Sequence, residues 1–94
     1  DLHSFPTRRS SDLLIRLLIL NGPTVGVDIG AKADIHHYLH TLAADGVGVI
    51  VISDDLAELI QNCNRIIVMK DGKAVSTVRA KDVDETTLSR TLSD

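Results

Sequence analysis

Two pairs of residues follow apolar runs of the chain and are the first places to look for chemistry. Asn21 and Gly22 come directly after one apolar run, and Asp54 and Asp55 come just after another. A buried strand that ends in an acidic residue places a carboxylate at the edge of a parallel sheet, where Mg²⁺ and phosphates bind. Simpler roles also fit, because Asn-Gly often forms a turn and aspartates often cap helices.

The histidines and the cysteine are weaker candidates. His36 and His40 are spaced as i and i+4, as two metal ligands on one helix face would be. The glutamate of the zinc-protease motif is absent, so solvent-facing histidines are the favoured interpretation. Cys63 is the only cysteine, and it continues an apolar helix face, which favours a core role. The sequence therefore predicts no metal ligand and no catalytic residue.

Apolar periodicity predicts the elements that hold these residues. Nearly continuous apolar runs at 14–20 and 47–52 predict two strands, each buried on both faces of a parallel sheet. Between them the spacing predicts a helix over 29–44, and its buried face consists of Ile35, Leu39, Leu42 and Ala43. Asp28 is expected to cap the start of this helix and Gly46 its end.

The second half of the chain continues the alternation of helices and strands. A short helix is expected after residue 53, capped by Ser53, Asp54 or Asp55, with one apolar face made of Leu56, Leu59, Ile60 and Cys63. Two strands, 66–69 and 74–78, flank the tight-turn pair Asp71 and Gly72 and predict a β-hairpin. A last amphipathic helix through Leu88 and Leu92 is expected to be capped by Asp82 or Asp84.

This order of elements predicts an α/β fold with parallel strands, crossover helices and a C-terminal β-hairpin at the edge of the sheet. The 94 residues allow one compact unit at most, and 44% hydrophobic residues favour a folded core over disorder. A net charge of -3 and only 2% aromatic residues make direct nucleic-acid binding a poor fit. No apolar run is long enough to span a bilayer, and no secretory signal is recognisable.

Residues 1–13 differ abruptly in composition from the rest of the chain. They resemble one reading frame of a synthetic sequencing adapter, translated as though it were coding. We therefore expect 1–13 to be an artefact, with a natural basic, Ser-rich leader as the alternative. The remaining domain, 14–94, is then expected to be a fragment whose gene continues upstream.

Several segments, in order, resemble the C-terminal part of the ATP-binding subunit of a bacterial sugar-type ABC importer. The segment 17–24 is similar to the Walker B strand, in which four apolar residues precede Asp-Glu-Pro-Thr, and 25–28 is similar to the D-loop. The segment 26–32 is close to the form found in importers of ribose-like sugars. Two later segments, 49–56 and 65–72, are similar to the switch strand with its loop and to the following strand and turn. The resemblance implies a partial P-loop NTPase fold.

The departures from the family pattern matter as much as the matches. Asn21 and Gly22 stand where the family has the Asp that orients Mg²⁺ and the Glu that acts as general base. Asp54 stands where the family has a His that contacts the γ-phosphate, and its charge would repel that phosphate. The phosphate-binding loop, the Gln loop and the signature motif are absent from 14–94. Without these donors, tight ATP binding and hydrolysis by the chain alone are not expected.

The resemblance implies a role in a larger assembly. Sugar importers of this family fuse two nucleotide-binding halves, and the departures indicate the degenerate, non-hydrolysing half. ATP and Mg²⁺ would be cofactors of the parent protein, contacted through Asn21, Asp28 and Asp54, with Asp28 the strongest candidate because D-loops cross the interface between halves. The implied partners are the second half and the membrane permease subunits, at the cytoplasmic face of the inner membrane.

Two other functional classes stay open from the sequence. Asp54 and Asp55 after a strand, with Lys70 after another, also fit a phosphoacceptor receiver domain, although that fold needs five parallel strands. An interaction module without a ligand is the other alternative. By family analogy, the strand that carries the phosphate-binding loop is missing from the middle of the sheet, so we expect a marginal or aggregating protein when the chain is expressed alone.

Overall fold

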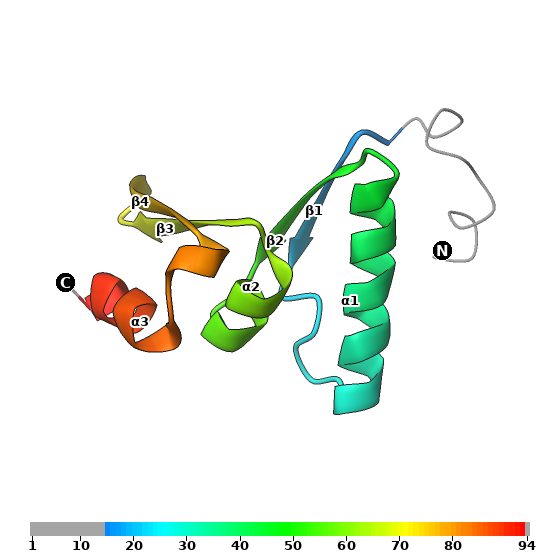
Figure 1. Ribbon diagram of the computed structural model, residues 1–94, viewed down its shortest axis with the longest axis horizontal. Helices are drawn as coiled ribbons and strands as arrows, with labels where there is room; N and C mark the ends of the chain where they lie inside the picture. The colour runs from blue at the N-terminus through cyan, green and yellow to red at the C-terminus, as the bar shows by residue number, and fades with distance from the viewer. Residues whose placement is uncertain (1–14, 94) are drawn as a thin grey trace. The chain divides into compact units, whose positions relative to one another are not determined.

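The computed structural model describes residues 15–93, so the expectations for 1–13 lie outside the described residues. The chain forms two compact units, one ending at Ile52 and the other beginning at Ser53, which corrects the expectation of one compact unit at most. Along the described chain, strands and helices alternate before a hairpin and a final helix follow (Figure 1). This order confirms the predicted α/β class.

The first unit is a two-stranded parallel sheet with one covering helix. β1 (Leu17–Asn21) pairs with β2 (Gly48–Ile52), and α1 (Ile29–Ala44) connects them. Its core consists of Leu42 and Val47, with five partly buried residues packed around them, namely Ile15, Leu18, Tyr38, Leu39 and Val49. The helix therefore covers one face of the sheet with Leu39 and Leu42, as predicted, and also with Tyr38, which was not predicted to be part of this face.

The end of α1 is set by a glycine in the left-handed conformation. Gly46 has φ +94°, its N–H donates to the carbonyl of Ala43 at 3.0 Å, and the N–H of Val47 donates to the carbonyl of Leu42 at 3.1 Å. These two bonds form a Schellman motif, and the Leu42–Val47 core contact accompanies it. The predicted C-terminal role of Gly46 is thus confirmed.

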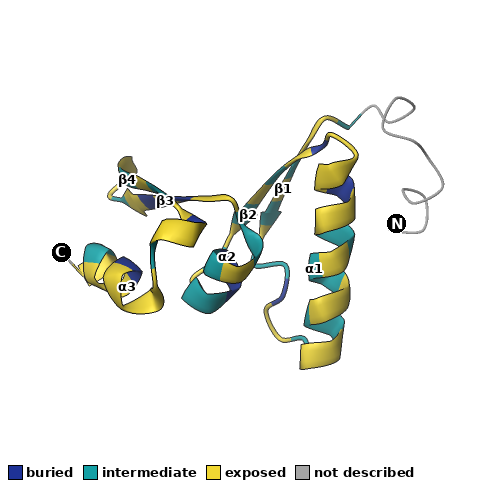
Figure 2. Ribbon diagram, in the orientation of Figure 1, coloured by how far each residue is buried: buried dark blue, intermediate teal, exposed yellow. Residues whose placement is uncertain are grey.

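The other face of the β1–β2 sheet is exposed, which corrects the prediction of strands buried on both faces. Leu17, Ile19, Ile50 and Ile52 are 54%, 58%, 48% and 50% exposed, and both strands alternate between exposed and half-buried residues (Figure 2). The described part of the chain supplies no second layer for this face. Ala43, predicted to lie on the buried face of α1, is also exposed.

The second unit packs two helices with a β-hairpin. Its elements are α2 (Leu56–Asn62), β3 (Arg65–Lys70), β4 (Lys73–Arg79), the 3₁₀ turn η3 (Ala80–Asp82) and α3 (Glu85–Ser93). The buried apolar residues are Leu59, Ile66, Val68, Ala80 and Leu88. Alternate residues of β3 are buried, so one face of the hairpin belongs to this core and the other does not.

The hairpin is confirmed, but its place in a single sheet is not. β3 and β4 pair antiparallel around Asp71 and Gly72, which have φ +51° and +78°, as a tight hairpin turn requires. The described strands form two separate two-stranded sheets, β1–β2 and β3–β4, rather than one sheet with an antiparallel edge. Strand pairing depends on contacts between distant segments, which local periodicity does not contain.

Tyr38 supplies a test of the first core. Its hydroxyl is buried and has no hydrogen-bond partner among residues 15–93, and burial raises its pKa. Because an unsatisfied buried hydroxyl costs free energy, Tyr38→Phe is expected to raise the free energy of unfolding by about 1 kcal/mol. Urea unfolding followed by circular dichroism checks this. A loss of stability in Tyr38→Phe would show that the hydroxyl is satisfied.

Asp84 makes the stability of α3 depend on pH. Its carboxylate accepts a hydrogen bond from the N–H of Thr87 at 2.8 Å, and bonds from Thr87 lower its pKa from 3.8. Because the folded pKa is the lower one, this stabilisation is present above about pH 3.8 and is lost as the pH falls through the folded value. Asp84→Asn, which keeps the capping oxygen, is expected to flatten that part of an acid-unfolding curve measured by circular dichroism. Curves of the same shape for wild type and variant would contradict the assignment.

Candidate functional site

The loop from β1 to α1 carries two of the predicted site residues. Asn21 is the last residue of β1 and is exposed. Gly22 follows with φ +61°, and its N–H donates to the carbonyl of Ile52 at 2.8 Å, which joins the ends of β1 and β2. A second bond, from the N–H of Val25 to the carbonyl of Gly22 at 3.2 Å, closes the turn. The turn is therefore built on Gly22, which offers no side chain for base chemistry.

Asp28 ends this loop as the N-cap of α1. Its Oδ1 accepts a hydrogen bond from the N–H of Ala31 at 2.8 Å, and its backbone is extended. The capping role that the sequence predicts is therefore confirmed, while the predicted nucleotide-site role stays a prediction. The neighbours Val25 and Ile29 are 79% and 86% exposed. An acidic residue thus lies between two protruding aliphatic residues.

Asp54 and Asp55 lie in the second unit and have different local roles. Asp55 is the N-cap of α2, with Oδ1 3.1 Å from the N–H of Glu58, and its own N–H donates to Ser53 Oγ at 3.0 Å. Asp54, which lies between Ser53 and Asp55 in the chain, is exposed. Of the three capping candidates, the structure selects Asp55, and Asp54 is left with its carboxylate at the surface.

The side chains around Cys63 belong to the interior of the second unit. Cys63 is the C-cap of α2 and is half-buried, so its predicted core role is only partly met. Burial first, and the charge of Glu58 second, raise the pKa of its thiol. Glu58 itself is only 6% exposed, which the sequence analysis missed because a glutamate on a short helix is usually a solvated residue. A raised thiol pKa is the opposite of what a nucleophilic cysteine needs.

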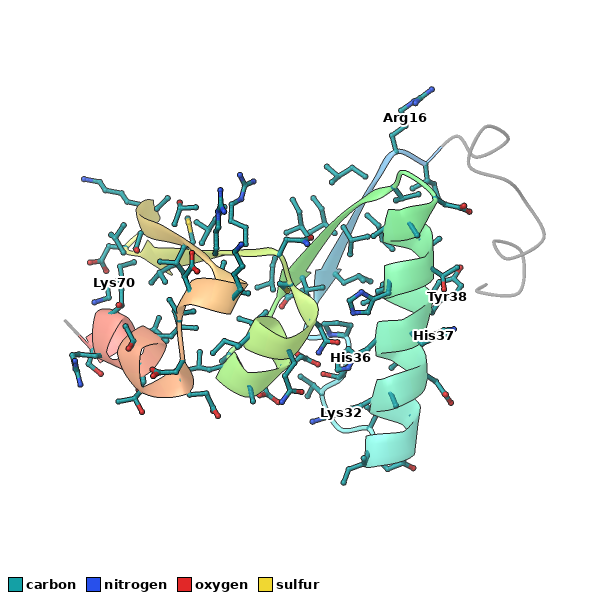
Figure 3. The ribbon with its side chains drawn as sticks, in the orientation of Figure 1. Arg16, Lys32, His36, His37, Tyr38 and Lys70 are labelled. Atoms are coloured by element: carbon teal, nitrogen blue, oxygen red, sulfur yellow. The ribbon has the colours of Figure 1, made fainter. Side chains whose placement is uncertain are left out.

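Two neighbouring histidines of α1 point in different directions. Figure 3 shows His36 and His37 on opposite sides of the helix, with Lys32 on the side of His36. Across residues 15–93, no group of three or more His, Cys, Asp or Glu side chains could hold a metal ion. No helix among the described residues is long and apolar enough to cross a membrane.

The predicted site residues are divided between the two units. Asn21 and Asp28 begin and end the same loop, whereas Asp54 lies in the other unit. Thr24 was not predicted as a residue of this site. It is 5% exposed and lies in the middle of the loop, where its carbonyl accepts a hydrogen bond from the N–H of Val27 at 3.4 Å. The Pro-Thr pair at 23–24 was visible in the sequence, but its burial was not.

The chain is similar in sequence to proteins that take part in sugar import. The chain is 43% identical over 74 residues to an arabinose import ATP-binding protein, AraG, of Pseudomonas syringae, covering 79% of this chain and 15% of the relative. It is 46% identical over 72 residues to a ribose import ATP-binding protein of Mesorhizobium japonicum, covering 77% of this chain and 14% of the relative. Over most of its length the chain is therefore similar to one part of the ATP-binding subunits of sugar importers. It spans about a seventh of the length of these curated relatives.

Solved structures of ABC transporter ATPases show the same fold. An ATP-binding cassette of an ABC transporter in its ADP conformation matches with a TM-score of 0.62 at 24% identity, covering 84% of this chain and 30% of that chain. The cbiO1 protein of Clostridium perfringens, part of the ABC transporter complex cbiONQ, matches with a TM-score of 0.63 at 23% identity, covering 83% and 30%. No family model matches the chain. The predicted partial ABC ATPase fold is thus confirmed, which leaves the receiver-domain alternative without structural support.

Proposed function

We propose that this chain is part of the ATP-binding subunit of a carbohydrate ABC importer and comes from the half that does not hydrolyse ATP. The relatives named for arabinose and ribose import support the substrate class. Gly22 supports the assignment to the non-hydrolysing half, because a general base needs a side chain and glycine has none. We propose further that 14–94 is the C-terminal part of that half and that 1–13 is foreign to it.

The loop from Asn21 to Ile29 is the proposed contact with the second nucleotide-binding half. Val25 and Ile29 are among the most exposed large apolar residues of the described chain, and they flank Asp28. An apolar pair around a carboxylate offers burial and a hydrogen-bond acceptor in one small surface. The Asp28 cap fixes the start of α1 and so holds this loop in place. ATP and Mg²⁺ would bind in the parent assembly, with Asn21 and Asp54 as further contacts.

The proposed assembly also includes membrane permease subunits, at the cytoplasmic face of the membrane. A chimera tests this, with residues 15–93 replacing the matching segment of the Mesorhizobium japonicum ribose import protein. The chimera, expressed with its permease, is expected to support ribose uptake and to trap one nucleotide per chain with vanadate. Two trapped nucleotides per chain would contradict a non-hydrolysing half, and a folded chimera without uptake would contradict the importer role.

Substitutions at Asp28 in that chimera separate the cap from the interface. Asn caps a helix about as well as Asp, so Asp28→Asn is expected to keep stability, whereas Asp28→Ala costs about 1 kcal/mol. If the carboxylate acts across the interface, both variants lose about tenfold in ATP hydrolysis, equivalent to about 1.4 kcal/mol. Asp34→Ala, an exposed aspartate further along α1, is the matched control. If Asp28→Asn kept full ATP hydrolysis, Asp28 would act only as the N-cap of α1.

A further inference from the structure

The outer face of the β3–β4 hairpin brings two arginines together. Arg65 and Arg79 are register partners, and both are exposed. The N–H of Ala80 donates to the carbonyl of Asn64 at 3.0 Å, and Asn64 and Ala80 are the positions one step further along the same ladder. Because hydrogen-bonded and non-hydrogen-bonded pairs alternate, Arg65 and Arg79 form a non-hydrogen-bonded pair, the type in which facing side chains are closest.

Nothing in the described chain offsets these two charges. Across residues 15–93, neither guanidinium has a hydrogen bond or an ion pair. The next register pair on the same face, Ile67 and Thr77, brings no carboxylate. Like charges that face each other directly across a sheet are destabilising. The hairpin therefore keeps an unfavourable arrangement that a bound anion would turn into a favourable one.

We propose that Arg65 and Arg79 form a binding site for a phosphate-type oxyanion that carries two or more charges. Each guanidinium presents five N–H donors in a planar fork that matches phosphate oxygens, so two adjacent forks can hold one group from both sides. The chain as a whole has a net charge of -3, so its overall charge repels anions. Binding of an oxyanion therefore has to come from the two arginines themselves. The site lies in the second unit and is independent of the loop from Asn21 to Ile29, so its failure leaves the proposed function untouched.

Titration with pyrophosphate tests the site directly. Phosphorus NMR of pyrophosphate is recorded with increasing amounts of the 94-residue chain at constant ionic strength. A saturable shift is expected for the wild type, with at least tenfold weaker binding in Arg79→Gln and Arg65→Gln. Lys81→Gln removes another exposed cation of the second unit and is expected to bind like the wild type. Equal binding by all four proteins, or no saturable binding by the wild type, would overturn the proposal.

A second measurement guards against variants that fail to fold. In chloride, Arg79→Gln removes the repulsion and is expected to raise the midpoint of thermal unfolding by about one to a few degrees. Pyrophosphate at the same ionic strength is expected to raise the midpoint of the wild type and leave that of Arg79→Gln unchanged. A lower midpoint for Arg79→Gln in chloride would show that the arginines stabilise the hairpin without an anion, which contradicts the argument.

Vesicle flotation then identifies the source of the phosphate group. Flotation of the wild type, but not of Arg79→Gln, with phosphatidylglycerol vesicles and not with phosphatidylcholine vesicles places the group on a lipid. Saturable pyrophosphate binding without flotation identifies a free phosphate ester as the source. Both results support the oxyanion site and separate its two sources.

Discussion

Gly22→Ala is expected to lower the free energy of unfolding by about 2–3 kcal/mol. At φ +61° a side chain costs about 1–2 kcal/mol, because Cβ approaches the backbone in the left-handed region. A Cβ at this position would also lie 3.1 Å from Cγ2 of Val25, which is closer than side chains normally pack. Urea unfolding followed by circular dichroism measures the loss.

A second glycine of the same loop separates the two causes. Gly26 has φ +78°, but a Cβ there would meet nothing within 4 Å, so Gly26→Ala is expected to cost only the conformational part, about 1–2 kcal/mol. Val25 is 79% exposed, so Val25→Ala alone is expected to change stability little. In the double variant Gly22→Ala with Val25→Ala, the steric part should disappear. Equal losses in Gly22→Ala and Gly26→Ala would show that Val25 moves aside freely.

This turn also decides whether a glutamate at position 22 could supply the general base that the proposed function lacks. A glutamate at position 22 would need the same left-handed backbone and the same space beside Val25 as an alanine. The bond from the N–H of Gly22 to the carbonyl of Ile52 ties that backbone to the end of β2, just before the predicted switch loop. Under the proposed function, the absence of the general base at position 22 is therefore linked to the left-handed geometry of this turn.

Local signals in the sequence predicted the local structure well. Asp28 and Gly46 were identifiable as the cap residues of α1 because capping depends on residues within a few positions of each other. The Asp71–Gly72 turn fixed the hairpin for the same reason. For the second helix, three neighbouring polar residues were equally suitable by type, and only the hydrogen bond from the N–H of Glu58 distinguishes Asp55.

Non-local features could not be predicted in the same way. An apolar run shows that both faces of a strand can be buried, but it does not show whether the chain contains enough structure to cover both. Ile19 and Ile50 are an example, because these register partners belong to apolar runs and yet both are about half exposed on the uncovered face. Within the candidate site, the departures at Asn21 and Gly22 were visible in the sequence. The contact between position 22 and Val25 was not, because it depends on the sign of one backbone angle.

The uncovered face of the β1–β2 sheet predicts how the isolated chain behaves. Four aliphatic side chains, Leu17, Ile19, Ile50 and Ile52, are about half exposed there, with no charged residue on that face of either strand. Among the described strands, β1 and β2 pair only with each other, so their outer edges are open. Exposed apolar patches and open edges both promote association between copies. We therefore expect the isolated chain to be marginally stable and to associate as its concentration rises.

A single charge at the centre of this face is expected to reduce that association strongly. Ile19→Lys places an ammonium group on the apolar patch while its methylene stem still covers the sheet, so sedimentation should give a mass near 10.2 kDa over a wider concentration range than for the wild type. Ile29→Lys is the matched control, because Ile29 is 86% exposed but lies at the start of α1. If the control suppressed association equally, net charge rather than this face would be responsible. A wild-type chain that stays monomeric and unfolds cooperatively with high stability would contradict the prediction and show that α1 alone suffices to stabilise this sheet.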